Sequence, residues 1–241
     1  YVILADGCSA EPDSDVGARL LVLNARDLLP RFIAAATDEA GRRACHWRLG
    51  RRIVRRAARQ ARELGAASAL DATLLIAWCD GATVYVHLYG DGCLAARRAD
   101  GEVVAIQVEY AGNAPYYLSY LLDRERLALY RVVAGNPLAA QSVSYVDETG
   151  TTTRLERFDA PLVFSFSLDA FPTVAVATDG LQSFVSASTS ERLSVRDVAR
   201  EMLEFDRSQD RFVQRRLHEL LLEYSKQLVF NLDDLGIGIF T

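Results

Sequence analysis

The chain has 241 residues, 50% of them hydrophobic, which is enough to bury a substantial core as one large domain. Its formal net charge of −5 gives no overall attraction to nucleic acid or to an anionic membrane surface. No apolar run reaches the roughly 18 residues that a membrane-spanning helix needs, and no signal-type segment is recognisable. The four cysteines lack paired or zinc-type spacing, so we expect reduced thiols in a cytoplasmic protein.

The first part of the chain predicts a strand followed by two helices. Residues 1–5 form an apolar run typical of a buried strand. A cap at residues 13–15 starts the next helix, which Pro30 kinks or restarts. A second amphipathic helix is expected over residues 42–64, and Gly65 ends it.

The middle of the chain changes to the period-two pattern of antiparallel strands. Asp80-Gly81 and Asp100-Gly101 lie between such runs and predict tight hairpin turns. The aromatic stretch 110–123 has no regular pattern; we interpret its tyrosines as packing residues, with a lid over a cleft as the alternative. The predicted strands cover residues 73–78, 83–89, 93–98, 102–108, 126–134, 141–147, 151–158 and 172–177.

Helices return over residues 195–205 and 211–226, and a final strand is expected over residues 235–240. The order of strand, helix pair, run of strands, helix pair and strand favours an α+β fold. In such a fold two antiparallel sheets form a sandwich that is flanked by helix pairs. The sequence shows no repeat or linker, so we expect residues 1–241 to form a single domain.

Four short acidic motifs stand at the ends of apolar runs that are far apart in the sequence. They are Asp6-Gly7, Gly90-Asp91-Gly92, Asp179-Gly180 and Asp233-Asp234. If the strands beside them are neighbours in the sheets, the carboxylates converge at one edge. Carboxylates with adjacent glycines, where backbone can come close, suit a hard divalent cation such as Mg²⁺ or Mn²⁺.

In order and placement these motifs resemble those of the metal-dependent protein phosphatase 2C family, and of its bacterial serine/threonine phosphatases in particular. Residues 71–74 are similar to a strand start of the family, and residues 237–240 to its terminal strand. The resemblance implies a four-layer α-β-β-α sandwich. It also implies a hydrolase of signal transduction that removes phosphate from phosphoserine or phosphothreonine of phosphorylated proteins. A hydroxide that bridges two metal ions would be the nucleophile, so Cys8 need not be catalytic.

The resemblance further implies roles for individual residues around two Mn²⁺ or Mg²⁺ ions. Asp6 would bridge both ions, and the Gly7 carbonyl would bind the second one. Asp179 and Asp233 would complete the first site. Asp91 would share a third, more weakly held ion with Asp179.

Two of the acidic residues have less direct assignments. Asp234 would not bind an ion directly but would lie behind the residues that do. Asp91, placed between two glycines, would also suit a simple hairpin turn, and this alternative stays open.

The chain also departs from the family pattern. The family opens with a strand that carries an arginine for the substrate phosphate and an acidic residue near the second ion, and this strand has no counterpart here. The alternative function is therefore a catalytically weak or inactive phosphatase-like regulatory or binding module. The phosphate-binding residue is unknown, and Arg19 and Arg26 are the nearest candidates, although we expect their helix to point them to solvent.

Arginines recur along one face of the predicted helix 42–64, and we expect a solvated face, with a partner or substrate surface as the alternative. A nucleic-acid-binding protein is a third and less favoured function, because this basic face lacks interleaved aromatic residues and the whole chain is acidic. The three histidines share no motif, so no histidine metal site is expected. The arginines of this face are Arg48, Arg52, Arg55, Arg59 and Arg62.

Overall fold

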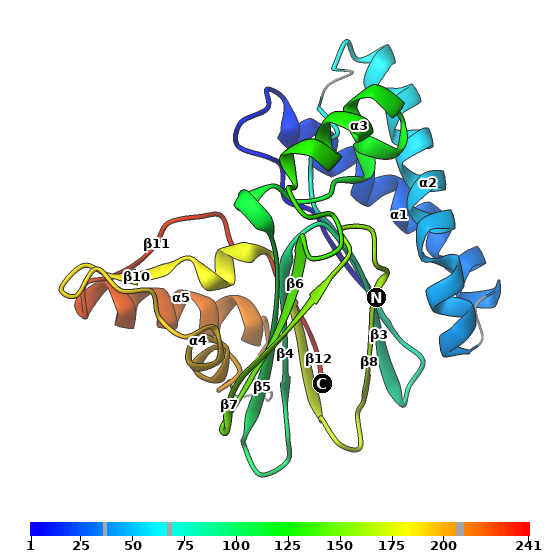
Figure 1. Cartoon of the computed structure of the whole chain (residues 1–241). Helices are drawn as coiled ribbons and strands as arrows, with labels where there is room; N and C mark the ends of the chain where they lie inside the picture. The colour runs from blue at the N-terminus through cyan, green and yellow to red at the C-terminus, as the bar shows by residue number, and fades with distance from the viewer. Residues whose placement is uncertain (36–37, 67–68, 206–209) are drawn as a thin grey trace.

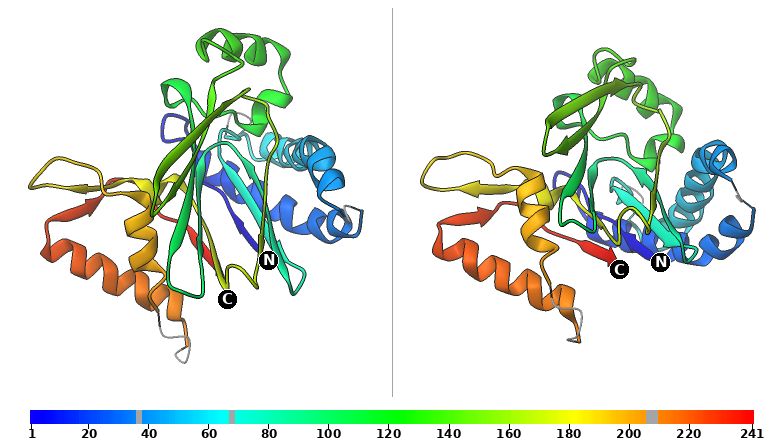
Figure 2. Two further views of the ribbon diagram at one scale, coloured as in Figure 1. Left: turned by 60° about the horizontal axis from the view of Figure 1, so that its bottom comes forward. Right: turned by 90° about the horizontal axis from the view of Figure 1, so that it is seen from below.

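Two antiparallel β-sheets lie face to face with helices on both outer sides, which gives four layers (Figure 1, Figure 2). The computed structural model describes residues 1–35, 38–66, 69–205 and 210–241. This arrangement confirms the predicted α+β sandwich with flanking helix pairs. Among the helices in these ranges, none is long and apolar enough to cross a membrane.

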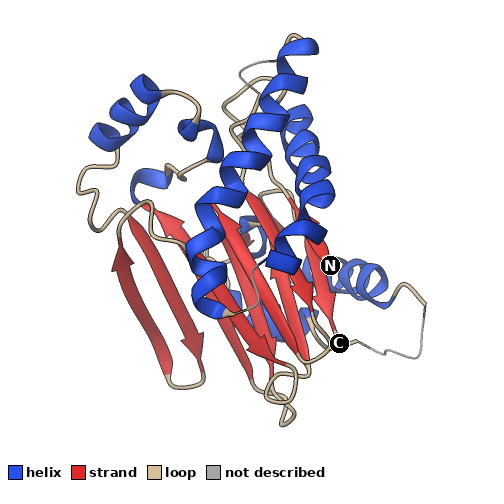
Figure 3. Ribbon diagram, turned by 90° about the vertical axis from the view of Figure 1, so that its right-hand side faces the viewer, coloured by secondary structure: helices blue, strands red, loops and turns tan. Residues whose placement is uncertain are grey.

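The first sheet has the strand order β1-β2-β3-β8. Its strands are β1 (Val2–Leu4), β2 (Leu74–Cys79), β3 (Thr83–Tyr89) and β8 (Leu162–Ser167). Helices α1 (Ser14–Ala35) and α2 (Glu39–Glu63) cover its outer face (Figure 3). The layer between helices and sheet is apolar, and Leu21, Ile53 and Ile76 are fully buried in it.

The second sheet has the strand order β12-β9-β4-β5-β6-β7. Helices α4 (Val195–Met202) and α5 (Phe212–Lys226) cover it through an apolar layer that includes Val198 and Leu220. Its strands are β4 (Gly92–Arg97), β5 (Val103–Tyr110), β6 (Gln141–Asp147), β7 (Gly150–Glu156), β9 (Thr173–Ala177) and β12 (Ile237–Phe240). A small sheet of β10 (Phe184–Ser186) and β11 (Val229–Asn231) lies beside it.

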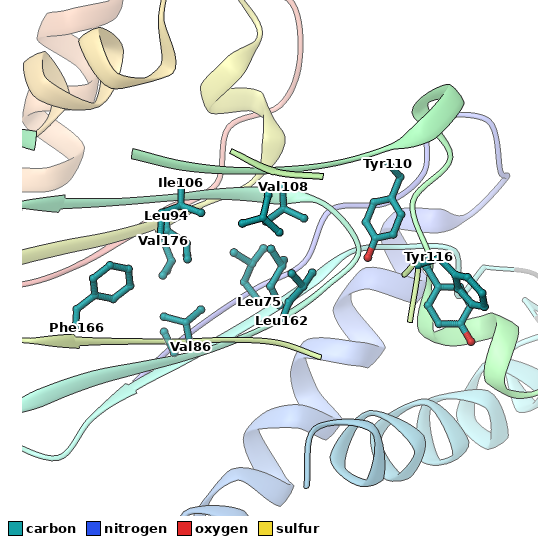
Figure 4. Packing of buried hydrophobic residues seen from close by; sticks show 14 of the residues in the cluster. Leu75, Val86, Leu94, Ile106, Val108, Tyr110, Tyr116, Leu162, Phe166 and Val176 are labelled. Carbon is teal, nitrogen blue, oxygen red and sulfur yellow. The ribbon is translucent and has the colours of Figure 1, made fainter. Parts of the chain in front are cut away.

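The space between the two large sheets is filled by their inward-facing side chains (Figure 4). Leu75 and Val86 of the first sheet meet Leu94 and Val176 of the second, and each is at most 1% exposed. Burial of one such side chain stabilises the folded state by about 1.5–3 kcal/mol. This core therefore fixes the two sheets, and the loops at their edges, relative to each other.

The chain between β5 and β6 leaves the sheet and forms an excursion of two short 3₁₀ turns, η1 (Ala111–Asn113) and η2 (Leu118–Leu121), followed by α3 (Arg124–Val133). The prediction of a strand over residues 126–134 is wrong. Asp123 caps a helix there, because its side chain accepts hydrogen bonds from the backbone N–H groups of Glu125 (2.8 Å) and Arg126 (3.1 Å).

The predicted hairpins at Asp80-Gly81 and Asp100-Gly101 are confirmed by the pairing of β2 with β3 and of β4 with β5. The short strands β8, β10 and β11 were not predicted. Helix α1 runs through Pro30, so this proline does not start a new helix. Helix α2 begins a few residues before the predicted start, because Asp38 caps it by accepting a hydrogen bond from the Gly41 N–H (2.6 Å).

Two histidines that the sequence does not connect meet in the core of the first layer. His46 of α2 and His87 of β3 are both buried, and their Nδ1 atoms are 3.0 Å apart. Burial lowers the pKa of both rings, and that of His87 falls to about 3. The pair is therefore neutral at physiological pH and acts as a packed polar contact between helix and sheet.

Candidate functional site

The four acidic motifs lie at the same edge of the sandwich. In the second sheet Ala177 is paired with both Cys93 and Ile237, so Asp179, Asp91 and Asp233 all follow or precede strands at this end. In the first sheet Leu4 is paired with Leu75, which places Asp6 there too. The predicted convergence of distant aspartates therefore occurs, and it results from strand register.

Asp91 occupies the connection between β3 of one sheet and β4 of the other. The alternative interpretation as a hairpin turn is wrong, because β3 and β4 do not pair with each other. Gly90 and Gly92 adopt positive φ angles of 88° and 149° on either side of it. This sharp crossing buries Asp91, which is 6% exposed, between the sheets.

The first motif is held by the start of β2. The Thr73 N–H donates to the Asp6 carbonyl (2.8 Å), and the Asp6 N–H donates to Thr73 Oγ1 (3.3 Å). A Cβ atom on Gly7 would lie 2.7 Å from Ser14 Oγ and 2.8 Å from the Ser14 backbone. A glycine is required here because the first turn of α1 packs directly on the motif.

The third and fourth motifs hold each other. The Thr178 N–H donates to the Gly236 carbonyl (3.0 Å), and Thr178 Oγ1 donates to the Asp234 carbonyl (3.1 Å). A Cβ atom on Gly180 would lie 2.2 Å from that same Asp234 carbonyl oxygen. The two loops are thus in van der Waals contact, and Asp179 is kept beside residues 233–236.

The fourth motif also has an internal hydrogen bond. The Asp234 N–H donates to Asp233 Oδ1 (2.9 Å), and the Asp233 N–H donates to Asn231 Oδ1 (2.8 Å). Both aspartates are exposed. The backbone N–H of Asp234 therefore orients the Asp233 carboxylate through Oδ1, and Oδ2 takes no part in this hydrogen bond.

The electrostatics of the cluster are those of carboxylates held close together. Burial and the charges of Asp179, Asp233 and Asp234 raise the pKa of Asp6 to about 7. Burial, and then the charge of Asp179, raises the pKa of Asp91 to about 7 as well. Burial and the charge of Asp233 raise the pKa of Asp179 above its ordinary value.

The Asp6 and Asp179 carboxyl groups also act on each other, and this contact raises the pKa of Asp6 further. A multivalent cation would favour the charged form of both groups. Among the described residues, no three acidic, histidine or cysteine side chains already have the spacing of a complete metal-binding group.

A cavity of about 930 Å³ opens beside the cluster, between α1, β1 and the loop before β12. Asp6, Asp233 and Asp234 lie on its wall. Arg19 also lines the cavity and is the one basic residue on this wall in the described part of the chain, although 79% of its side chain is exposed. Arg26, the other candidate for phosphate binding, pairs with Asp27 (3.2 Å) and does not line the cavity.

The excursion between β5 and β6 is attached to the loop that holds the first motif. Asp71 is 4% exposed, and its carboxylate accepts hydrogen bonds from Ser119 Oγ (2.6 Å) and from Arg126 (2.7 Å). The carbonyl of Asp71 accepts from the Cys8 N–H (2.8 Å). This role of Asp71 was not predicted from the sequence, where an acidic residue just before a buried strand was the one signal for it.

Tyr117 lies at the same contact. Burial, followed by the proximity of Cys8 and the charge of Asp91, raises the pKa of Tyr117. All four cysteines, Cys8 included, are free thiols, as predicted. Cys8 thus lies between the first acidic motif and the excursion as a packing contact.

The fold and the acidic edge together define an α-β-β-α sandwich with a carboxylate site where its two sheets meet. The family description "Protein phosphatase 2C" matches residues 1–222, and the chain belongs to this family. This finding confirms the resemblance drawn from the four motifs. No curated protein sequence matches the chain.

Solved structures with the same fold include a bacterial serine phosphatase, with a TM-score of 0.55 at 13% identity. A bacterial serine phosphatase with an arginine-to-lysine substitution gives a TM-score of 0.54, also at 13% identity. In both comparisons 98% of this chain and 83% of the other chain are covered. The serine/threonine phosphatase PstP/Ppp of Mycobacterium tuberculosis is 16% identical with a TM-score of 0.49, over 98% of this chain and 85% of that one.

Proposed function

We propose that this protein is a metal-dependent phosphomonoester hydrolase that removes phosphate from phosphoserine and phosphothreonine of proteins. Membership of the protein phosphatase 2C family supports the reaction class. The observation that carries the proposal is the convergence of carboxylates from four separated loops at one edge of the sandwich, with raised pKa values for Asp6, Asp91 and Asp179. A cavity whose wall includes Asp6 and Asp233 opens beside them. Without a cation, this concentration of negative charge is unfavourable.

The donor set fits hard divalent cations, which prefer carboxylate and carbonyl oxygens. Asp6 and the Gly7 carbonyl would bind two Mn²⁺ or Mg²⁺ ions, together with Asp179 and Asp233. Asp91 would serve a third ion, and Asp234 would orient Asp233 through the hydrogen bond from its N–H (2.9 Å). When bound, such ions supply Lewis-acid activation of the attacking water and neutralise charge on the phosphoryl group.

The side chains of the chain itself have three tasks in this proposal. Asp6, whose pKa is raised to about 7, must be deprotonated to act as a ligand. Thr73 accepts a hydrogen bond from the Asp6 N–H, and Thr178, next to Asp179, is hydrogen-bonded to the loop that contains Asp234 and Gly236. Arg19, on the wall of the cavity, is the candidate for contact with the substrate phosphate.

The test is the variant Asp179→Asn, which keeps the side-chain shape and removes the charge. We expect it to abolish Mn²⁺-dependent hydrolysis of a chromogenic aryl phosphate and of a phosphothreonine peptide. Asp169→Asn is the matched control, since Asp169 is exposed and precedes the end of β9 that is opposite to the acidic edge. Unchanged turnover in a folded Asp179→Asn protein, checked by circular dichroism, would refute the assignment.

A phosphatase-like binding module without turnover is the second candidate. It is favoured by the state of Arg19, the candidate for phosphate binding, whose side chain is 79% exposed and lies 3.7 Å from the Asp15 carboxylate. Calorimetry with Mn²⁺ and the same hydrolysis assay separate the two functions. Metal binding without phosphate release supports the module, and release that depends on Asp179 supports the enzyme.

We also propose that residues 1–241 fold as one domain. The core between the sheets takes side chains from strands along most of the chain length, which supports this proposal. A single cooperative transition in urea, seen at the same midpoint by fluorescence and circular dichroism, is expected. Two separate transitions would contradict it.

A further inference from the structure

Helix α2 carries an unusual concentration of positive charge. Between Glu39 and Glu63 it has nine arginines and two glutamates, whereas the chain as a whole has a net charge of −5. Seven of these arginines are exposed, and six of them, all but Arg43, lie along one face that we call the arginine stripe. It consists of Arg48, Arg51, Arg52, Arg55, Arg59 and Arg62.

The stripe is narrow and straight. At 100° per residue, its six members fall within a sector of about 100° around the helix axis, and they extend over about 21 Å along it. The opposite face of the helix, which includes Ile53, Val54 and Ala57, is fully buried against the first sheet. The stripe therefore faces outward along the layer of α1 and α2 that Figure 3 shows.

The fold does not neutralise these charges. In the ranges that the structure describes, none of the six guanidinium groups has a carboxylate within ion-pair distance. Arg56, just outside the sector, does pair with Asp27 (3.9 Å). Like charges at spacings of three and four residues repel each other and weaken a helix. The stripe thus opposes the stability of the element that carries it.

We propose that the arginine stripe is a docking surface for an acidic segment of the phosphoprotein substrate. The proposal rests on the proposed function and adds a substrate property to it. Glutamate, aspartate or phosphorylated side chains at helical spacing would match the stripe, since guanidinium binds carboxylate and phosphate in a bidentate way. The charge complementarity is local, because the chain outside α2 is strongly acidic.

A protein segment fits this surface better than a nucleic acid does. No aromatic residue lies between the arginines of the stripe, so the bases of a nucleic acid would have no ring on which to stack. A nucleic-acid duplex is also broad and densely negative, so it would come close to the acidic rest of the molecule and be repelled by it. A short acidic helix would contact the stripe alone.

The position of the stripe relative to the site supports a substrate as the occupant. The C-terminal part of α2 lies against α1, where Asn24 Nδ2 donates to Gln60 Oε1 (2.6 Å). The first turn of α1 packs on the first acidic motif, and α1 lines the cavity. A segment bound to the stripe would therefore lie one helix away from the cavity.

The experiment uses a phosphothreonine peptide joined by a glycine-serine linker to a glutamate-rich helical tail, and the same peptide with a glutamine-rich tail. On the unmodified protein we expect a KM about tenfold lower for the glutamate tail at low salt, with equal kcat. The double variant Arg52→Glu/Arg55→Glu should remove this difference. Its hydrolysis of an aryl phosphate, which has no tail, should stay unchanged.

The matched control is Arg124→Glu/Arg192→Glu, which changes two exposed arginines elsewhere and shifts the net charge equally. It should keep the preference for the glutamate tail. Equal KM values for the two tails on the unmodified protein, or the same loss in both double variants, would overturn the proposal. Tighter, stripe-dependent binding of duplex DNA than of the glutamate tail would overturn it as well.

Direct binding separates this proposal from the proposed function. Fluorescence anisotropy with the labelled glutamate tail alone measures docking without hydrolysis. If the protein hydrolyses no phosphoester but binds the tail through the stripe, the proposed function fails and the docking surface stands. If hydrolysis depends on Asp179 but the tail does not bind, the docking surface is wrong and the enzyme assignment stands.

Discussion

The acidic edge and the arginine stripe are both groups of like charges that the fold leaves without opposite partners. They differ in burial. The aspartates come from four loops, and three of them, Asp6, Asp91 and Asp179, are partly or largely withdrawn from water, so their pKa values rise. The arginines come from one exposed helix face and stay charged. The first group can be neutralised by protons or cations, whereas the second can be neutralised only by an anionic partner.

This difference shows what each arrangement can do. Partly buried carboxylates bind a small, strongly charged ligand tightly, because water competes poorly with them. Exposed guanidinium groups bind an extended partner through many weak contacts, each of which salt screens. The acidic edge therefore suits chemistry, and the stripe suits recognition. Four predictions test this contrast, in order of decreasing effect.

The largest effect is expected for Asp6→Asn. Because Asp6 would bind both ions, its loss should lower Mn²⁺-dependent kcat by about a thousandfold or more. The same variant should lose the rise in melting temperature that Mn²⁺ gives the unmodified protein. Calorimetry and thermal unfolding with and without Mn²⁺ measure both quantities. A full Mn²⁺ response in Asp6→Asn would contradict the ligand role.

The second effect concerns pH in the absence of metal. A carboxyl group whose pKa is raised in the folded state stabilises the fold below its unfolded pKa of 3.8, and this contribution is lost as pH rises through about 7. The metal-free protein should therefore be less stable at pH 8 than at pH 5. With a chelator present, the free energy of unfolding of Asp91→Asn should exceed that of the unmodified protein by on the order of 2 kcal/mol at pH 8. At pH 4 the two values should differ little. Urea unfolding at the three pH values measures this, and a larger gain at pH 4 than at pH 8 would show that the sign is wrong.

The third effect tests the cation on the wall of the cavity. Arg19→Ala should raise the KM for a phosphothreonine peptide by about three- to tenfold with little change in kcat, since an exposed charge contributes modestly. Arg26→Ala is the control on the same helix and should behave like the unmodified protein. Equal KM values for the two variants would remove Arg19 from the site.

The smallest effect concerns the stability of α2. Arg55 has arginine neighbours three and four residues before it and four residues after it, so Arg55→Gln should relieve repulsion and raise the free energy of unfolding by about 0.5 kcal/mol. Salt should reduce this gain, because it screens the exposed charges. A loss of stability in chemical denaturation would mean that the stripe has a structural partner.

The sequence alone predicted much of the architecture. Alternating apolar runs with Asp-Gly turns located the hairpins β2–β3 and β4–β5, and the helical periodicity located α1, α2, α4 and α5. These signals are local, since turn residues and repeated apolar positions act within one element. The order of the acidic motifs also identified the family.

Local signals also misled. Residues 126–134 alternate enough to resemble a strand, yet the cap at Asp123 and the packing of Tyr130 against the core make them a helix. The pairing of His46 with His87, and the ion pair of Asp71 with Arg126 (2.7 Å), join residues that are far apart in the chain. No pattern within a single element encodes such contacts, because they depend on which elements become neighbours.

The amino-acid sequence thus determined the residue types of the site and the strands that carry them. The tertiary structure decided that these strands end at one edge, that Asp91 lies where the chain crosses between sheets, and that Arg19 lines the same cavity as Asp6 and Asp233. The physical reason is that strand order and register set the positions of side chains in space. Both are chosen by burial of the whole apolar core between the sheets and not by any one segment.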